Sequence, residues 1–114
     1  MRRVRSDDRI DLLQGTLDLL VLRTLQLGPL HGHGITKAIQ RLSDDQLLVE
    51  HGSLYPALHR LVKNGWLTAA WQDTRKGRPM KVYRLTPAGR RQLSREESNW
   101  QRLCAAIGLV LKRA

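Results

Sequence analysis

The clearest amphipathic pattern in the chain lies between Ser53 and Gly65, where apolar residues recur at helical spacing. The apolar stripe consists of Leu54, Ala57, Leu58 and Leu61. The opposite face has no acidic residue and carries Tyr55, Pro56, His59, Arg60 and Lys63. We expect Ser53 to be the N-cap, Pro56 to lie in the first turn and Gly65 to be left-handed just past the end. Such a helix is either a recognition helix for the DNA major groove or an ordinary amphipathic helix with a solvated basic face.

Two further helices are expected upstream of this stretch. Thr16 is a candidate N-cap for the first, with Asp18 in the first turn, where a negative charge suits the helix dipole. Its leucines cover more than one face, so we expect a central helix or one that packs against a second chain. Gly28-Pro29 ends it. A turn at residues 31–34 leads into the second helix, whose apolar positions are Ile35, Ala38, Ile39 and Leu42.

The pattern changes to that of extended chain after the amphipathic helix. Residues 67–73 and 80–86 alternate between apolar and polar side chains, which predicts the two strands of a hairpin. Gly77 in the connecting turn suits a positive φ. The tip of this hairpin carries Arg75, Lys76 and Arg78. A shorter apolar run at residues 47–49 is expected to be an edge strand.

A long helix is predicted from Pro87 to about Leu111. Thr86 is suited to cap it, and proline is well tolerated at the first helical position. A heptad seam runs along this helix, formed by Leu93, Trp100, Leu103, Ile107 and Val110. Because few apolar residues remain to cover that seam, we expect it to face a second subunit.

The chain is strongly basic, and the basic residues are concentrated in one part of it. Its 114 residues carry a formal net charge of +10, which favours a polyanionic partner, most commonly nucleic acid. Residues 60–95 contain ten Lys or Arg and one acid, Asp73, whereas residues 1–50 mix both signs. Residues 1–11 are expected to be a flexible basic arm, which either touches a phosphate backbone or is solvated.

The predicted order is helix, helix, short strand, helix, basic hairpin and long helix. That is the order of a winged helix-turn-helix domain, a mainly α (α+β) fold, with a C-terminal dimerisation helix. We place the domain at residues 12–86 and the dimerisation helix at 87–114. In this fold the third helix enters the major groove and the hairpin lies on the adjacent backbone.

Other classes of function find little support in the residues. There is no nucleophile with a plausible base, no apolar carboxylate pair and no phosphate-binding glycine loop, so we predict neither an enzyme nor a cofactor. The four histidines lack metal-ligand spacing. The amino-terminal residues lack a signal-peptide core and the longest apolar segment is interrupted by polar residues, which indicates a cytoplasmic protein without membrane contact. The single cysteine, Cys104, is expected to be a buried small hydrophobe.

The sequence also resembles the PadR-type transcriptional regulators over roughly residues 12–111. The matching residues are Gly15-Thr-Leu, Leu20 to Leu27, His31-Gly32, Gly52-Ser-Leu-Tyr-Pro-Ala-Leu, Arg60-Leu61, Gly65, Gly77-Arg78, Lys81, Tyr83, Leu85-Thr86 and Gly89. The resemblance implies a winged helix that dimerises through its last helix, in the compact branch of the family. It further implies binding of near-palindromic operator DNA, repression and, in many members, release by a small aromatic effector. His33 and Trp66 depart from the family pattern, which usually has an aromatic and an aliphatic residue there.

The residues expected to contact DNA fall into two groups, those at the major groove and those on the phosphate backbone. Near the groove we place Tyr55, His59, Arg60 and Lys63, with Pro56 on the same face and Ser53 at the positive helix end. On the backbone we place the hairpin residues Arg75, Lys76, Gly77, Arg78 and Lys81. Arg60 is the candidate for reading a base, because arginine can bind guanine with two hydrogen bonds.

Two questions stay open at the level of sequence. Trp100 is either an anchor of the subunit interface or, as in some members of the family it resembles, part of an effector pocket. A basic winged helix can also serve in RNA binding or on the ribosome, although this chain lacks the exposed aromatic platform typical of single-stranded RNA recognition. A two-fold dimer suits duplex DNA with half-sites about one helical turn apart.

Overall fold

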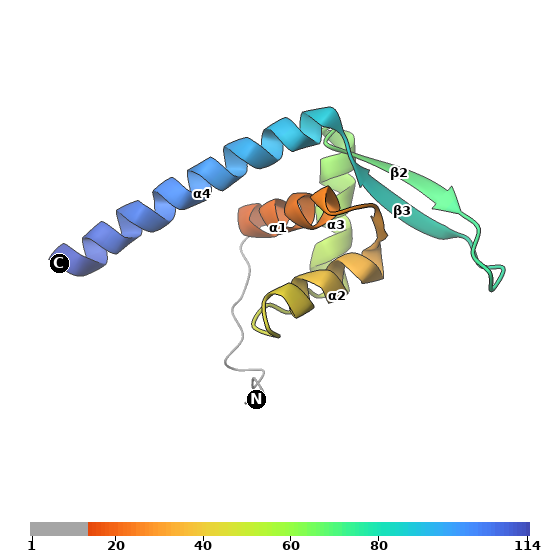
Figure 1. Ribbon diagram of the computed structural model, residues 1–114, viewed down its shortest axis with the longest axis horizontal. Coiled ribbons are helices and arrows are strands. Elements are labelled where there is room, and N and C mark those ends of the chain that lie inside the picture. Colours follow the sequence, from red (N-terminus) through yellow and green to blue (C-terminus); the bar gives the residue numbers. More distant parts are fainter. Residues whose placement is uncertain (1–13) are drawn as a thin grey trace.

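The computed structural model describes residues 14–114, so the expected basic arm at residues 1–11 lies outside the described residues. Residues 14–114 form an α+β winged helix of four helices and a three-stranded antiparallel sheet (Figure 1). In chain order the elements are α1 (Gln14–Gln26), β1 (Leu30–His31), α2 (Gly32–Leu42), α3 (His51–Lys63), β2 (Leu67–Gln72), β3 (Met80–Leu85) and α4 (Pro87–Arg113).

The core lies where α1, α2 and α3 meet the sheet. Helix α1 contacts α2, α3, α4 and β3, and in Figure 1 it crosses α3 in the middle of the body. The largest fully buried side chains of the core are Leu22, Ile35, Leu54, Leu58, Leu61, Leu67, Leu93 and Val21. Burying one such side chain contributes about 1.5–3 kcal/mol, so this cluster is the main source of stability. The expectation of a central first helix is confirmed.

The short strand lies elsewhere than predicted. Residues 47–49 are not a strand, although Val49 is buried and contributes its side chain to the core. The third strand is β1, which pairs antiparallel with β3 through Leu30↔Tyr83 and His31↔Val82. β1 has only two residues, between Gly28-Pro29 and the start of α2, so it is too short to show an alternating pattern. It is extended because it pairs with β3.

Helices α1 and α2 begin earlier than their apolar stripes suggest. Helix α1 includes Thr16, which is therefore not its N-cap. Helix α2 begins at Gly32, with His31 as the N-cap: the Nδ1 atom of His31 accepts a hydrogen bond from the Gly34 amide at 3.0 Å. The segment expected to be a separate turn is thus the cap and first turn of α2. Histidine is not among the residue types that favour caps in general, and for this reason the cap is not evident from sequence.

The hairpin and the last helix match the prediction. Strands β2 and β3 pair from Leu67↔Leu85 to Gln72↔Met80, and Gly77 in their turn has φ +79°. Helix α4 starts at Pro87 with Thr86 as its N-cap and runs for 27 residues, so its second half projects beyond the body (Figure 1). In the part of the chain described, from residue 14 onwards, every helix is too short or too polar to cross a bilayer.

A tight joint connects the end of α3 to the start of α4. The Thr86 hydroxyl donates to the Gly65 carbonyl at 2.7 Å and accepts from the Gly89 amide at 2.9 Å. The Thr86 amide donates to the Trp66 carbonyl at 3.1 Å. Gly65 has φ +78°, as expected after a helix end. A Cβ atom on Gly89 would lie only 2.1 Å from the Trp66 carbonyl oxygen, so this joint accepts no side chain there.

We expect Gly89→Ala to destabilise the protein by about 1–3 kcal/mol or more, because the backbone of Trp66 or the first turn of α4 must shift. Gly52→Ala is the matched control: Gly52 is also helical, and a Cβ atom added to it would have no neighbour within 4 Å in the chain. That control is expected to be neutral or slightly stabilising. Urea unfolding at fixed protein concentration measures both, and equal stabilities for the two variants would contradict the joint described here.

Candidate nucleic-acid interface

Helix α3 has the two faces that its sequence predicts. Leu54, Ala57, Leu58 and Leu61 are fully buried against the core. The opposite side is exposed, and it carries Tyr55, Pro56, His59 and Lys63. Burial of the whole apolar stripe fixes the rotation of α3 about its axis, so the cationic side is held toward solvent.

The start of α3 differs from the prediction. The helix begins at His51 with Glu50 in the N-cap position, so Ser53 is not the cap. Pro56 consequently lies inside the helix, later than expected. Its ring removes one intrahelical hydrogen bond, and both Pro56 and Gly52 are exposed, so water can satisfy the freed carbonyl. The Glu50 side chain makes no capping hydrogen bond, which leaves the first amides of α3 uncovered by a side-chain cap.

Tyr55 connects α3 to the first turn of α2. A Cβ atom on Gly32 would lie 2.7 Å from the Tyr55 hydroxyl and 3.0 Å from its ring carbons, so the absence of a side chain at Gly32 makes room for that ring. Tyr55 is 46% exposed, and its remaining surface is available to a partner. The structure therefore brings together the His31-Gly32 pair and the Tyr55 of two separate sequence motifs.

Arg60, the expected base-reading residue, has a partner within the protein. Its guanidinium is 2.8 Å from Oδ1 of Asp18 on α1, with side-chain exposures of 35% and 15%. Burial raises the pKa of the Asp18 carboxyl, although the charge and the hydrogen bond of Arg60 act to lower it. Asp18 is thus bound to α3, whereas its sequence position suggested an interaction with the dipole of its own helix. Base reading by Arg60 stays a prediction, and Arg60 has a second role in holding α3 on α1.

The hairpin presents a cationic tip, as predicted. Arg75, Lys76, Gly77 and Arg78 are all exposed, and the Thr74 hydroxyl donates to the Arg78 carbonyl at 2.7 Å to close the turn.

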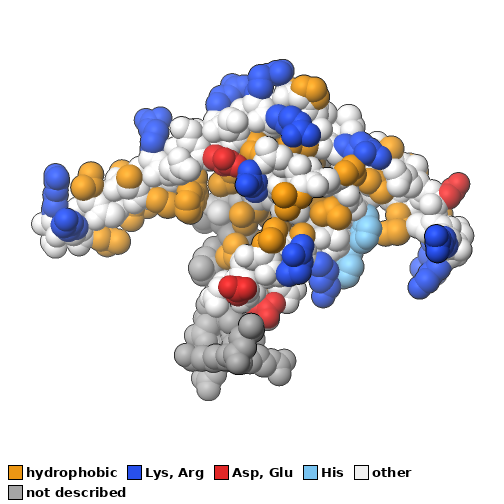
Figure 2. Space-filling model, viewed as in Figure 1, with side chains coloured by type: hydrophobic (Ala, Val, Ile, Leu, Met, Phe, Trp, Pro, Cys, Tyr) orange, Lys and Arg blue, Asp and Glu red, His pale blue; other side chains and the backbone are white. Residues whose placement is uncertain are grey.

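Lys81 lies 5.8 Å from the ring centre of Trp71, a cation–π distance. Trp71 is 68% exposed. The sequence gives no sign of this exposure, since an apolar residue at an inward position of a strand is usually buried. Figure 2 shows cationic side chains at the outer end of the hairpin and over the helical body.

The second half of α4 is exposed along its apolar side. The exposed side chains include four of the five expected interface residues: Trp100, Leu103, Ile107 and Val110. For Leu93, the fifth, the prediction is wrong, because it is 1% exposed and belongs to the core of its own chain. The heptad seam therefore changes role along the helix, from intramolecular packing at Leu93 to open surface from Trp100 onwards. Cys104 is exposed in the chain, not buried as expected.

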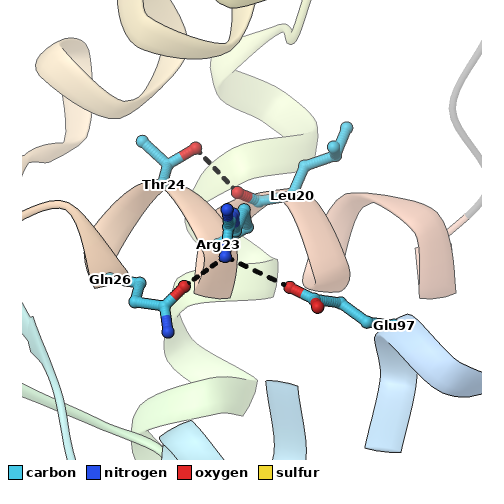
Figure 3. Close-up of polar contacts among 5 residues, drawn as sticks. All are labelled: Leu20, Arg23, Thr24, Gln26 and Glu97. Atoms are coloured by element: carbon cyan, nitrogen blue, oxygen red, sulfur yellow. Dashed lines mark hydrogen bonds and ion pairs between the residues drawn. The ribbon is translucent and has the colours of Figure 1, made fainter. Parts of the chain in front are cut away.

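An apolar groove lies between α1 and α4 beside Trp100. It has a volume of about 420 Å³ and is lined by Thr16, Leu19, Leu20, Arg23, Leu47, Glu97 and Trp100. Arg23 on α1 closes one side by an ion pair of 3.6 Å with Glu97 on α4 (Figure 3). A neighbouring hollow of about 340 Å³ also reaches Trp100 and contains Glu96.

Glu96 carries a buried carboxylate oxygen without a partner. Its Oε2 atom has no hydrogen-bond partner among the described residues, while Oε1 accepts from Gln92 at 3.2 Å. Burial raises the pKa of Glu96, the Gln92 hydrogen bond lowers it, and the nearby Asp18 raises it further. Among residues 14–114 no group of three histidine, cysteine or acidic side chains is arranged to hold a metal ion.

The fold and this cationic surface define a winged-helix protein suited to nucleic acid, and comparisons with known proteins narrow the class. Residues 21–95 match the family described as the transcriptional regulator PadR-like family. A PadR family transcriptional regulator from Eggerthella lenta is 35% identical with a TM-score of 0.76, covering 89% of this chain and 86% of that one. A transcriptional regulator from Clostridium thermocellum is 27% identical with a TM-score of 0.78, covering 83% and 92%. A transcriptional regulator of Mycobacterium tuberculosis is 39% identical over 77 residues, 68% of each protein.

The chain therefore belongs to the PadR-like family of transcriptional regulators, and the resemblance inferred from its motifs is confirmed.

We expect Arg60→Ala to destabilise the protein by about 1–3 kcal/mol at pH 7, because it leaves the half-buried Asp18 carboxylate without its donor. Asp18→Asn should have a smaller effect, since it removes the charge whose burial is unfavourable. In Arg60→Ala the pKa of Asp18 rises further above its unfolded value. The folded state then binds the proton more readily, so the loss of stability shrinks as the pH falls toward 5. Urea unfolding at pH 7 and pH 5 measures this; a loss independent of pH would contradict it.

Proposed function

We propose that this protein is a sequence-specific double-stranded DNA-binding regulator that acts as a homodimer and represses transcription. The observation that carries this proposal is the geometry of α3: one face is completely buried, and the other presents Tyr55, His59 and Lys63 beside a hairpin whose tip has three exposed cations. Side chains on α3 supply contacts to base edges and phosphates, and the hairpin supplies backbone contacts. Ser53, Pro56 and Arg60 belong to the same proposed surface.

Dimerisation is inferred from α4. All residues from 98 to 114 are exposed in the single chain, and they include Leu103, Ile107 and Val110 on one side. An apolar helix face that projects from the body into water needs a partner, and a second copy of α4 offers the same seam. Two chains joined in this way present two copies of α3 to one side of a duplex, which suits an operator with two half-sites.

We expect the proposed DNA contacts to differ in what they recognise. Arg78→Ala is expected to weaken binding to operator and random duplex to a similar extent and to reduce the salt dependence, because a hairpin arginine binds phosphate. Lys63→Ala or Arg60→Ala is expected to weaken the operator more, by about 1–3 kcal/mol if that side chain reads a base. Fluorescence anisotropy at two salt concentrations, on an operator selected from a random pool, separates the two patterns.

Two further measurements test the dimer and the rival function of RNA binding. Ile107→Glu, in the α4 seam, is expected to yield monomers by analytical ultracentrifugation and to lose most of the operator affinity while the fold persists. An RNA competitor tests the rival function of RNA binding: displacement of the operator by RNA as effectively as by unlabelled operator would overturn the proposal. Equal losses on operator and random duplex for every α3 variant would remove the claim of sequence specificity.

We further propose that the groove beside Trp100 binds a small aromatic effector that releases the DNA. Its walls are mainly leucine side chains and the Trp100 ring, which is 49% exposed, and its volume of about 420 Å³ falls within the range of small-molecule sites. Flat aromatic compounds bind such walls by stacking. The alternative, in which Trp100 only anchors the dimer, predicts no binding of this kind.

Quenching of tryptophan fluorescence distinguishes the two roles of Trp100. A panel of flat aromatic compounds is expected to quench the protein and to lower its DNA affinity, and both effects should be lost in Trp100→Leu. Trp71→Leu is the matched control, since Trp71 is also exposed but lies on the hairpin, away from the groove. Unchanged quenching in Trp100→Leu would leave Trp100 as an interface anchor alone.

A further inference from the structure

Three histidines and a tyrosine form a continuous row of rings across the first turns of α2 and α3. The ring centres of His31 and His33 are 6.3 Å apart and parallel within 2°. His51, from α3, meets His33 edge to face at 6.0 Å and Tyr55 at 5.7 Å. Figure 2 shows the histidines gathered on the helical body next to the hairpin. Residues from two separate helix starts thus form one surface, which their spacing in the chain does not reveal.

The histidines in this row differ in whether they already have a hydrogen-bond partner. His31 is half-buried, and its Nδ1 lone pair accepts the hydrogen bond that caps α2, so a proton at that atom would break the cap. His33 and His51 are both exposed, and within residues 14–114 neither side chain takes part in a hydrogen bond or an ion pair. Their ring nitrogens are therefore open to an external partner.

The surroundings of His33 and His51 favour an anionic partner. On α2 the next charged residue after His33 is Lys37; His51 follows Glu50, the N-cap position of α3, and its ring meets that of Tyr55. On β3 the residues beside Val82, the partner of His31, are Lys81 and Tyr83. Glu50 is the one acid in this set. The first turns of two helices lie here as well, and their amide ends carry positive partial charge.

We propose that His33 and His51 form a proton-linked clamp for a backbone phosphate of duplex DNA, so that DNA binding takes up protons from solution. Histidine is the side chain that changes charge between about pH 5 and 8, and a bound phosphate favours the protonated ring, in which both nitrogens donate. The clamp rests on the proposed DNA-binding function, and it adds two residues to that surface. Its position at the start of α3 places the phosphate where the helix end is open, with no side-chain cap.

The clamp makes operator affinity depend on pH. Each proton taken up on binding raises the association constant by up to tenfold per unit fall in pH, so we expect an increase of about tenfold or more between about pH 8.5 and pH 6 at constant ionic strength. In the His33→Gln/His51→Gln variant this increase is expected to be mostly lost. Glutamine keeps a polar side chain of similar length without the titrating ring, and neither position belongs to the core, so folding is expected to persist.

Two control variants isolate the clamp. Arg78→Ala lowers affinity through the hairpin but is expected to keep the increase toward low pH. His59→Gln removes the exposed histidine of α3 that lies outside the row; as a proposed groove contact it is expected to lower affinity at every pH but to keep the increase toward low pH. Isothermal titration calorimetry at pH 7 in two buffers of different ionisation enthalpy counts the protons directly, and the double variant should take up fewer than the parent protein. Burial raises the pKa values of Asp18 and Glu96, and both residues are present in the parent protein and in the double variant, so the comparison cancels them.

The outcomes separate the clamp from the function on which it rests. Duplex binding without a pH-dependent increase, or an increase that persists in the double variant or disappears in His59→Gln, would overturn the clamp and leave DNA binding intact. Absence of duplex binding at every pH would overturn both. The clamp is supported if the double variant, and neither control variant, loses both the increase in affinity toward low pH and the proton uptake.

Discussion

The close approach of α4 to the end of α3 is the constraint on which the geometry of this protein depends. Thr86 holds the carbonyls of Gly65 and Trp66 through its hydroxyl and its amide, and Gly89 lets the first turn of α4 rest on the Trp66 carbonyl. The hairpin leaves from Trp66 and returns at Thr86, so the same few atoms set the directions of α3, the hairpin and α4. In the proposed dimer, this joint sets how far apart the two copies of α3 lie.

Helix α1 connects α3 to α4. It binds α3 through Asp18 and Arg60, and it binds α4 through Arg23 and Glu97. The groove beside Trp100 lies between α1 and α4, and Glu96 lines the adjoining hollow, near enough to Asp18 for the two charges to repel. In the proposed regulation, a ligand in this groove contacts α1, the helix whose Asp18 holds Arg60.

Much of the fold follows from the sequence because local and global preferences agree there. The stripe of Leu54 to Leu61, the Thr86-Pro87 start and the hairpin around Gly77 are predictable, because their apolar periods and turn residues admit one interpretation. The failures share a different cause. β1 exists only through its pairing with β3, and Leu93 has the spacing of a seam but the position of a core residue. The Arg60–Asp18 pair and the histidine row join residues whose proximity only the tertiary structure creates.

Two glycines, Gly32 and Gly89, are required by packing within the chain, whereas Gly52 is not. Gly32 makes room for Tyr55 and Gly89 for the Trp66 carbonyl, so each has a reason within the chain. Gly52 has neither a close neighbour nor a positive φ, and a glycine inside a helix costs about 0.5–1 kcal/mol relative to alanine. Stability alone thus favours a side chain at this position. In the proposed interface, a bare backbone at the start of α3 lets a phosphate reach the open amides, and alanine there would obstruct that approach.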